Sequence, residues 1–105
     1  MKVLHLISGG DTGGAKTHVH SLLAGLTPRI QVKMVCFTEG PFVEEARALG
    51  IDTQVFPGRN FFANLKQLTR MVRDEGFDLI HSHGSRGNMM AAFLAKKTGL
   101  PTVST

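Results

Sequence analysis

Residues 3–17 read VLHLISGGDTGGAKT, and this stretch decides the fold. Its first five residues form an apolar run that is typical of a buried parallel strand. A glycine-rich turn follows at residues 8–14, and residues 15–26 have the spacing of an amphipathic helix. Glycine lets a backbone approach a ligand closely, and the first N–H groups of a helix have no partners inside it. The stretch therefore predicts a strand, a turn and a helix that together suit a phosphate or diphosphate.

The spacing of residues within the turn excludes two known phosphate-binding motifs. The Walker A pattern needs adjacent glycine and lysine, whereas Ala15 separates Gly14 from Lys16 here. The pattern G-x-G-x-x-G is also missing. Two interpretations remain: a phosphate cradle at Gly13 and Gly14, or a tight turn that binds nothing. The hydroxyl of Thr17 either reaches the ligand or bonds to its own backbone.

The same alternation continues along the chain. Further strands are predicted at residues 32–37, 53–56, 78–82 and 102–104, after a first strand at 2–7, and helices at 15–26, 42–49, 61–75 and 86–98. Short apolar strands that alternate with helices predict an α/β fold: a parallel sheet with helices on both faces. Right-handed crossovers favour a doubly wound, Rossmann-like strand order of 3-2-1-4-5. The loops after the first and fourth strands then meet where open α/β sheets bind ligands.

Composition excludes several classes of protein. The 105 residues carry a formal charge of +4, which permits anionic partners without choosing among them. Cys36 is the single cysteine, so no internal disulfide forms and a cytoplasmic location is expected. The apolar run after Lys2 is too short for a signal peptide or a membrane span. The seven Phe do not interleave with basic residues, so no nucleic-acid partner is expected.

Five histidines are candidates for chemistry. His81 and His83 lie two apart, so they share one face of the fourth predicted strand, where such a pair can grip a metal. The spacing supports no third ligand, with His5 a candidate only across strands, and we therefore expect no metal. We expect His81 to pack within the strand and His83 to line the cleft. His18 and His20 lie about 200° apart on the first helix, so they do not act together.

The helix predicted at 61–75 is amphipathic. Its apolar face carries Phe62, Leu65, Leu68 and Val72, and its basic face carries Lys66, Arg70 and Arg73. The basic face is either simply solvated or in peripheral contact with anionic lipid headgroups at the inner face of a membrane, where each cation adds about 1 kcal/mol.

Two segments beside the predicted cleft carry further candidates. Arg59 and Phe61 follow the third strand and are candidates to touch an acceptor, although Phe61 suits the core equally. The helix at 86–98 is apolar nearly all round, which predicts burial on more than one side, either within an ordinary core or under further chain. Arg86 and Asn88 begin that helix, and the guanidinium of Arg86 suits a phosphate or another anion.

Four segments together resemble a known family. Residues 13–19 (GGAKTHV), 39–42 (EGPF) with 49–51 (LGI), 78–84 (DLIHSHG) and 99–103 (GLPTV) are similar, in order and spacing, to the N-terminal part of family-4 retaining glycosyltransferases of the GT-B fold. The resemblance covers the whole chain. It departs at Lys16, where the family most often has Glu, so the turn is more positive here.

The resemblance implies a function. Residues 1–105 would form a single Rossmann-like domain, the acceptor side of a two-domain enzyme that moves a sugar from a nucleotide-diphosphate donor to an acceptor hydroxyl with retention. The acceptor would be a sugar or a lipid-linked sugar, and the nucleotide sugar is a substrate rather than a cofactor. The donor is held mainly by a C-terminal domain, whose acidic motif is missing here, so this segment alone would be inactive.

The resemblance also implies roles for individual residues. Those expected near the donor diphosphate are Gly13, Gly14, Lys16 and Thr17, and those expected on the acceptor side of the cleft are His83, Gly84, Arg86, Asn88 and Arg59. The exposed edge of the fifth strand is a candidate dimer contact. The alternative from another class is a small, non-catalytic nucleotide- or phosphate-binding α/β module.

Overall fold

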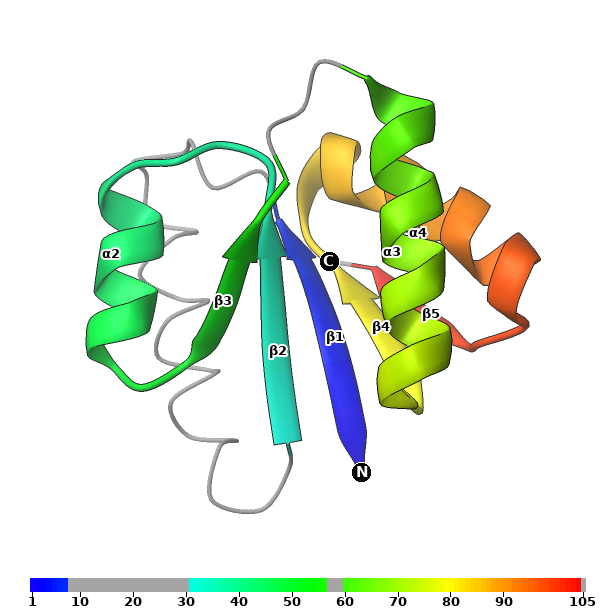
Figure 1. Cartoon of the computed structure of the whole chain (residues 1–105), viewed down its shortest axis with the longest axis horizontal. Coiled ribbons are helices and arrows are strands. Elements are labelled where there is room, and N and C mark those ends of the chain that lie inside the picture. The colour runs from blue at the N-terminus through cyan, green and yellow to red at the C-terminus, as the bar shows by residue number, and fades with distance from the viewer. Residues whose placement is uncertain (8–30, 57–59, 105) are drawn as a thin grey trace.

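The computed structural model describes residues 1–7, 31–56 and 60–104 of the chain. Five parallel strands form one sheet in the order β3-β2-β1-β4-β5, which confirms the predicted order (Figure 1). The strands are β1 (Lys2–Ile7), β2 (Gln31–Cys36), β3 (Asp52–Val55), β4 (Leu79–Ser82) and β5 (Thr102–Ser104). The helices are α2 (Pro41–Ala48), α3 (Phe61–Glu75) and α4 (Gly84–Thr98).

The central strand is β1. It pairs with β2 along its whole length and with β4 from Val3 to Leu6. Its last five residues are all buried, which explains why they read as one continuous apolar run with a single histidine. Because the sheet winds outward in opposite directions from β1 and β4, the switch point lies at the carboxyl ends of these two strands.

Side chains alternate between the two faces of the sheet, and each face has its own core. On one face, Met34 and Cys36 pack with Phe42 and Val43 of α2. On the other, residues of β1, β2 and β4 pack with α3 and α4, among them Leu4, Leu6, Val35, Ile80, Leu65, Leu68 and Leu94. Helices therefore cover both faces, as predicted, and α3 and α4 lie together on the second one (Figure 1).

The termini of α3 follow from its sequence. The Oδ1 atom of Asn60 accepts a hydrogen bond from the backbone N–H of Ala63 at 3.0 Å and caps the first turn. Gly76 ends the helix with a φ of 74°, a left-handed conformation that glycine adopts without strain. These two signals explain why the predicted bounds of this helix are confirmed at both ends.

Two predictions about burial are wrong. The side chain of Phe62 is 69% exposed, although helical spacing places it with the buried Leu65 and Leu68. It lies in the first turn of α3, where it makes an edge-to-face contact with Phe61 at the surface. In the part of the chain that the structure describes, helix α4 buries one side only and leaves Met89 and Phe93 exposed. An ordinary core on more than one side is therefore wrong, and a surface that further chain covers stays a prediction.

Helix α4 also begins two residues earlier than predicted, at Gly84 rather than at residue 86. None of the helices in the described ranges is long and apolar enough to cross a membrane.

Candidate functional site

The carboxyl ends of β1 and β4 and the start of α4 meet at the switch point. The backbone N–H of His83 donates to the carbonyl oxygen of Leu6 at 2.9 Å, which ties the end of β4 to the end of β1. The same oxygen approaches Gly87, where a Cβ atom would lie 2.7 Å from it. Glycine at position 87 therefore lets the first turns of α4 sit directly against β1, as close helix–strand packing in nucleotide-binding α/β folds requires.

Three histidine side chains gather on one face of the sheet below this junction. His5 and His81 are register partners on β1 and β4, and His83 extends the same face past the strand end. The ring centroids lie 4.9 Å apart for His5 and His81, 5.3 Å for His5 and His83, and 4.3 Å for His81 and His83. Nδ1 of His5 lies 3.0 Å from Nε2 of His83, so one of these nitrogens donates a hydrogen bond to the other. We call this group the histidine cluster.

Burial keeps His5 and His81 of the histidine cluster neutral. The side chain of His5 is fully buried, and its burial, followed by repulsion from His81 and His83, lowers its pKa from 6.5 to about 3. Burial also lowers the pKa of the half-buried His81. At neutral pH these imidazoles therefore carry lone pairs that accept hydrogen bonds or bind a metal rather than positive charges.

Two polar side chains fix the start of α4 to the sheet. The hydroxyl of Ser82, fully buried at the end of β4, donates to Oδ1 of Asn88 at 2.6 Å. It also lies 3.3 Å from the hydroxyl of Ser104 on β5. Ser82 engages the oxygen of Asn88, so within the described contacts the amide N–H groups of Asn88 are left to donate to another acceptor.

The structure brings together part of the predicted site. His83, Gly84 and Asn88 lie at the carboxyl end of β4, as the sequence predicts. Arg86 lies in the first turn of α4, and its side chain is outside the described part. The remaining predicted residues, and two further histidines, also fall outside it: Gly13, Gly14, Lys16, Thr17, Arg59, His18 and His20.

Sequence reasoning missed two residues of this junction and gave a third too little weight. Ser82 and Gly87 were not singled out, although a Gly-x-x-Gly spacing at residues 84–87 is a signal of close helix packing. His5 was considered only as a candidate across strands, because its pairing with His81 depends on the order of the strands in the sheet.

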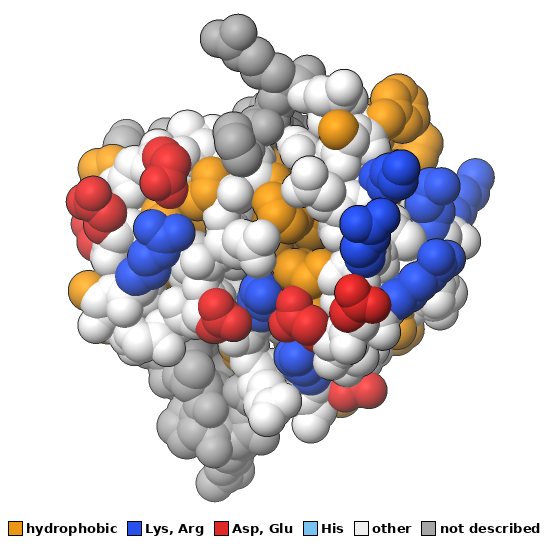
Figure 2. Space-filling model, viewed as in Figure 1, with side chains coloured by type: hydrophobic (Ala, Val, Ile, Leu, Met, Phe, Trp, Pro, Cys, Tyr) orange, Lys and Arg blue, Asp and Glu red, His pale blue; other side chains and the backbone are white. Residues whose placement is uncertain are grey.

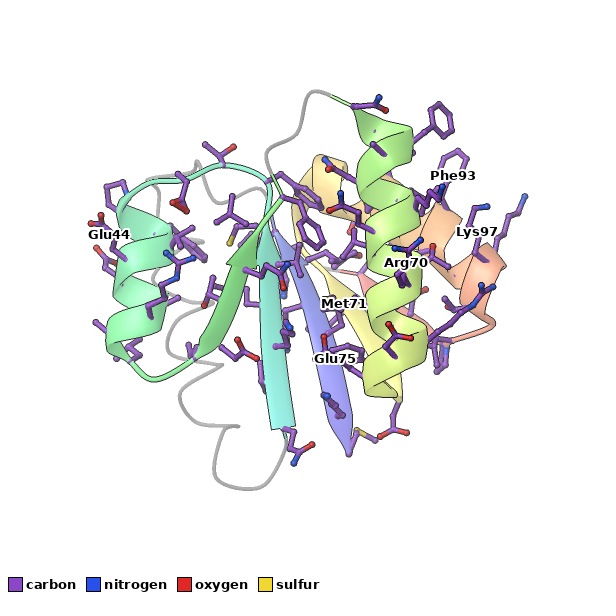
Figure 3. All side chains as sticks on the ribbon, viewed as in Figure 1. Glu44, Arg70, Met71, Glu75, Phe93 and Lys97 are labelled. Atoms are coloured by element: carbon purple, nitrogen blue, oxygen red, sulfur yellow. The ribbon has the colours of Figure 1, made fainter. Side chains whose placement is uncertain are left out.

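A basic groove lies away from this junction, between α3 and α4. It encloses about 560 Å³ and is lined by Phe62, Leu65, Lys66, Thr69, Arg70, Arg73, Asp74 and Lys97. The guanidinium of Arg73 donates to the carbonyl oxygen of Lys97 at 3.2 Å, which links the two helices. Lysine and arginine side chains gather on this face (Figure 2), and Figure 3 places Arg70 on α3 close to Lys97 on α4.

Exposed aromatic rings border the basic groove. Phe62 and Phe93 are 69% and 43% exposed, and both make edge-to-face contacts with Phe61. In Figure 3, Phe93 lies on the same side of the molecule as Arg70 and Lys97. The surface therefore combines cations with apolar rings at one edge of the α3–α4 face.

Comparison with family models identifies one family, and comparison with solved structures identifies the fold. The family model described as Glycosyltransferase Family 4 matches residues 12–105. No curated protein sequence matches the chain. A glycosyltransferase of Rickettsia africae ESF-5 shares 14% identity with a TM-score of 0.82, over 98% of this chain and 28% of that one. Anabaena HepE, solved in complex with UDP-glucose, shares 20% identity with a TM-score of 0.83, over 99% of this chain and 28% of that one.

MurG of Acinetobacter baumannii gives a similar result. It shares 14% identity with a TM-score of 0.78, over 98% of this chain and 34% of that one. At these identities the likeness shows the fold, and the chain spans about a third or less of each of these three proteins.

Proposed function

The chain belongs to glycosyltransferase family 4, and from this premise we propose that it forms the acceptor-side domain of an enzyme that transfers a sugar from a nucleotide-diphosphate donor to an acceptor hydroxyl, with retention. The observation that carries the proposal is the family match over residues 12–105, on a sheet whose switch point lies between β1 and β4. HepE, a protein of the same fold, was solved with UDP-glucose bound.

The leaving group defines what this domain has to do. When the bond between sugar and diphosphate breaks, negative charge grows on the diphosphate, and N–H donors fixed in place stabilise that charge. We propose that the backbone of Gly13 and Gly14 supplies such donors, with Lys16 and Thr17 beside them. The donor sugar nucleotide is a substrate, and this proposal assigns no cofactor to the transfer.

The acceptor side is assigned to the start of α4. The hydrogen bond from Ser82 holds Asn88 in place and leaves the amide N–H groups of Asn88 for an acceptor oxygen. His83 precedes α4 as its N-cap residue and is held to the end of β1 through its backbone N–H. We propose that His83 and Asn88 orient the acceptor, and that Arg59, Gly84 and Arg86 complete this side of the cleft.

Amide chemical shifts of the ¹⁵N-labelled chain test where the donor binds. With UDP-glucose as the probe, we expect millimolar ligand to shift the amides of Gly13 and Gly14. Glucose without the nucleotide should leave them in place, because the diphosphate makes the proposed contact. Shifts limited to the basic groove, or none at millimolar UDP-glucose, would remove the donor contact from this domain.

We also propose that the basic groove and its aromatic border bring the domain to an anionic membrane surface. The cations Lys66, Arg70 and Arg73 are exposed on one helix, and the rings of Phe62 and Phe93 are exposed beside them. Cations attract anionic headgroups, and exposed aromatic rings suit the interface between headgroups and acyl chains. A lipid-linked acceptor would then lie close to the cleft.

Vesicle binding tests this contact. Each basic residue near an anionic surface adds about 1 kcal/mol, so replacing Lys66, Arg70 and Arg73 by Gln should weaken binding to phosphatidylglycerol-containing vesicles by about a hundredfold. The matched pair is Arg70→Gln against Arg47→Gln, which removes the same charge from α2. Sedimentation with vesicles should show a loss for Arg70→Gln alone. Equal losses for the two single variants would show only a general effect of net charge.

A further inference from the structure

We propose that the histidine cluster, formed by His5, His81 and His83, binds one divalent transition-metal ion, Zn²⁺ or a cation of similar chemistry. One ligand atom from each of these three side chains lies within 4.8 Å of the other two. The site joins the central strand β1 to the end of β4, on the sheet face opposite α3 and α4. It departs from the expectation, based on sequence spacing, that no metal binds.

The three imidazole nitrogens determine which class of cation the site binds. Three imidazoles are borderline ligands that suit Zn²⁺, Ni²⁺, Cu²⁺ and Co²⁺, whereas Mg²⁺ and Ca²⁺ require oxygen ligands. Among the described residues the cluster contains histidine alone, with no carboxylate in it. Three nitrogen ligands leave a fourth tetrahedral position for water or another ligand.

An unsatisfied atom supports the proposal. Nδ1 of His5 bonds to Nε2 of His83, and within the described ranges the fully buried Nε2 of His5 has no hydrogen-bond partner. If His5 donates through Nδ1, its Nε2 is an acceptor without a donor; if it accepts through Nδ1, its Nε2–H is a donor without an acceptor. Buried polar atoms normally have partners, so an orphan here calls for an explanation. A metal ion bound to the imidazole nitrogen provides one.

Binding requires a modest rearrangement of the rings. Zinc–nitrogen bonds of about 2.0–2.1 Å place tetrahedral ligand atoms about 3.3 Å apart, so the widest pair has to close by about 1.5 Å. The rings of His5 and His83 already lie in contact, with Nδ1 of His5 3.0 Å from Nε2 of His83. Because this contact uses Nδ1 of His5, its Nε2, unsatisfied within the described residues, is the atom that it offers to the ion. The planes of these two rings differ by only 17°, so the imidazoles have to turn about their χ angles before their nitrogens converge. The half-buried His81 gives the ion access from the surface, while the fully buried His5 stays fixed on β1.

The proposal gives the metal a structural role, which includes fixing the position of His83, a residue assigned above to the acceptor side. An ion held by β1 and by the end of β4 stabilises the folded chain, because the three ligands are far apart in sequence and come together only on folding. The melting temperature should therefore rise when the metal-stripped chain is given Zn²⁺ and fall again with a chelator.

Cobalt titration of the 105-residue chain tests the site directly. After removal of metals with EDTA and dialysis, Co²⁺ should give visible d–d absorption that saturates at one equivalent, and one equivalent of Zn²⁺ should abolish it. His81→Gln and His83→Gln should each abolish the signal while circular dichroism shows the fold retained. The double variant His18→Gln/His20→Gln, which replaces the other two histidines, should keep the signal at full amplitude.

The unmodified chain alone is enough to overturn the proposal. Absence of saturable cobalt absorption, together with an unchanged melting temperature at excess Zn²⁺, would exclude the site whether or not any variant folds. Loss of the signal in the His18→Gln/His20→Gln variant, or its persistence in His81→Gln, would place the metal elsewhere. None of these readouts depends on glycosyltransferase activity.

Discussion

Replacing Gly87 with alanine is expected to destabilise the chain by about 3 kcal/mol. The added Cβ atom would lie 2.7 Å from the carbonyl oxygen of Leu6 and 3.3 Å from its carbonyl carbon. Both are backbone atoms of the central strand, so relief requires α4 to move away from β1. Helix propensity alone predicts the opposite sign, since alanine in place of glycine inside a helix normally adds about 1 kcal/mol of stability.

Urea unfolding followed by circular dichroism measures this effect. The control is Ala92→Gly at an exposed position of the same helix, which should cost about 1 kcal/mol through propensity alone. A Gly87→Ala variant as stable as the unchanged chain, or more stable, would show that α4 does not pack against β1 as described.

The second large effect concerns activity. The 105-residue chain by itself is expected to transfer no sugar, whereas the protein in its full natural length is expected to do so. The chain spans 28% to 34% of the lengths of the three similar proteins described above, and the family resemblance assigns most donor contacts to a second domain. A site formed by one domain alone does not enclose the diphosphate and does not exclude water. Transfer needs both enclosure of the diphosphate and exclusion of water.

Radiolabelled UDP-glucose and a panel of acceptors measure this difference. A shortened form of the full-length protein that lacks residues 1–105 serves as the matching control and should also be inactive. Sugar transfer by the 105-residue chain alone would contradict the division of the site between two domains.

The fold was predictable because its signals are local. The apolar run at residues 3–7 marks a strand buried on both faces, and β1 is observed there. Asn60 and Gly76 mark the two ends of α3 by capping and by a left-handed turn, and both predicted bounds are confirmed. The strand order follows from right-handed crossovers and a single reversal of the winding.

The errors arise where packing between distant segments decides the outcome. Helical spacing placed Phe62 in the core, but spacing does not tell how far the first turn extends beyond the sheet that it covers. The start of α4 was placed two residues late, because the hydrogen bond from the His83 N–H to Leu6, which sets the end of β4, links residues far apart in sequence.

In the candidate site, too, local signals were predicted correctly and contacts between distant segments were not. Local spacing placed His81 and His83 on one face, and the structure confirms this. The third member, His5, belongs with them only because β1 and β4 are neighbours and their register pairs His5 with His81. Ser82 and Gly87 were likewise identified only from the contacts that they make in the assembled sheet.

The configuration of the transferred sugar tests the proposed retaining transfer most directly. The full-length protein would be incubated with UDP-glucose and other nucleotide sugars, and the coupling constant of the anomeric proton in the product would be measured by NMR. A family-4 retaining enzyme predicts that the product keeps the anomeric configuration of the donor. Inverted product, or no transfer from any nucleotide-diphosphate sugar tested, would contradict the account.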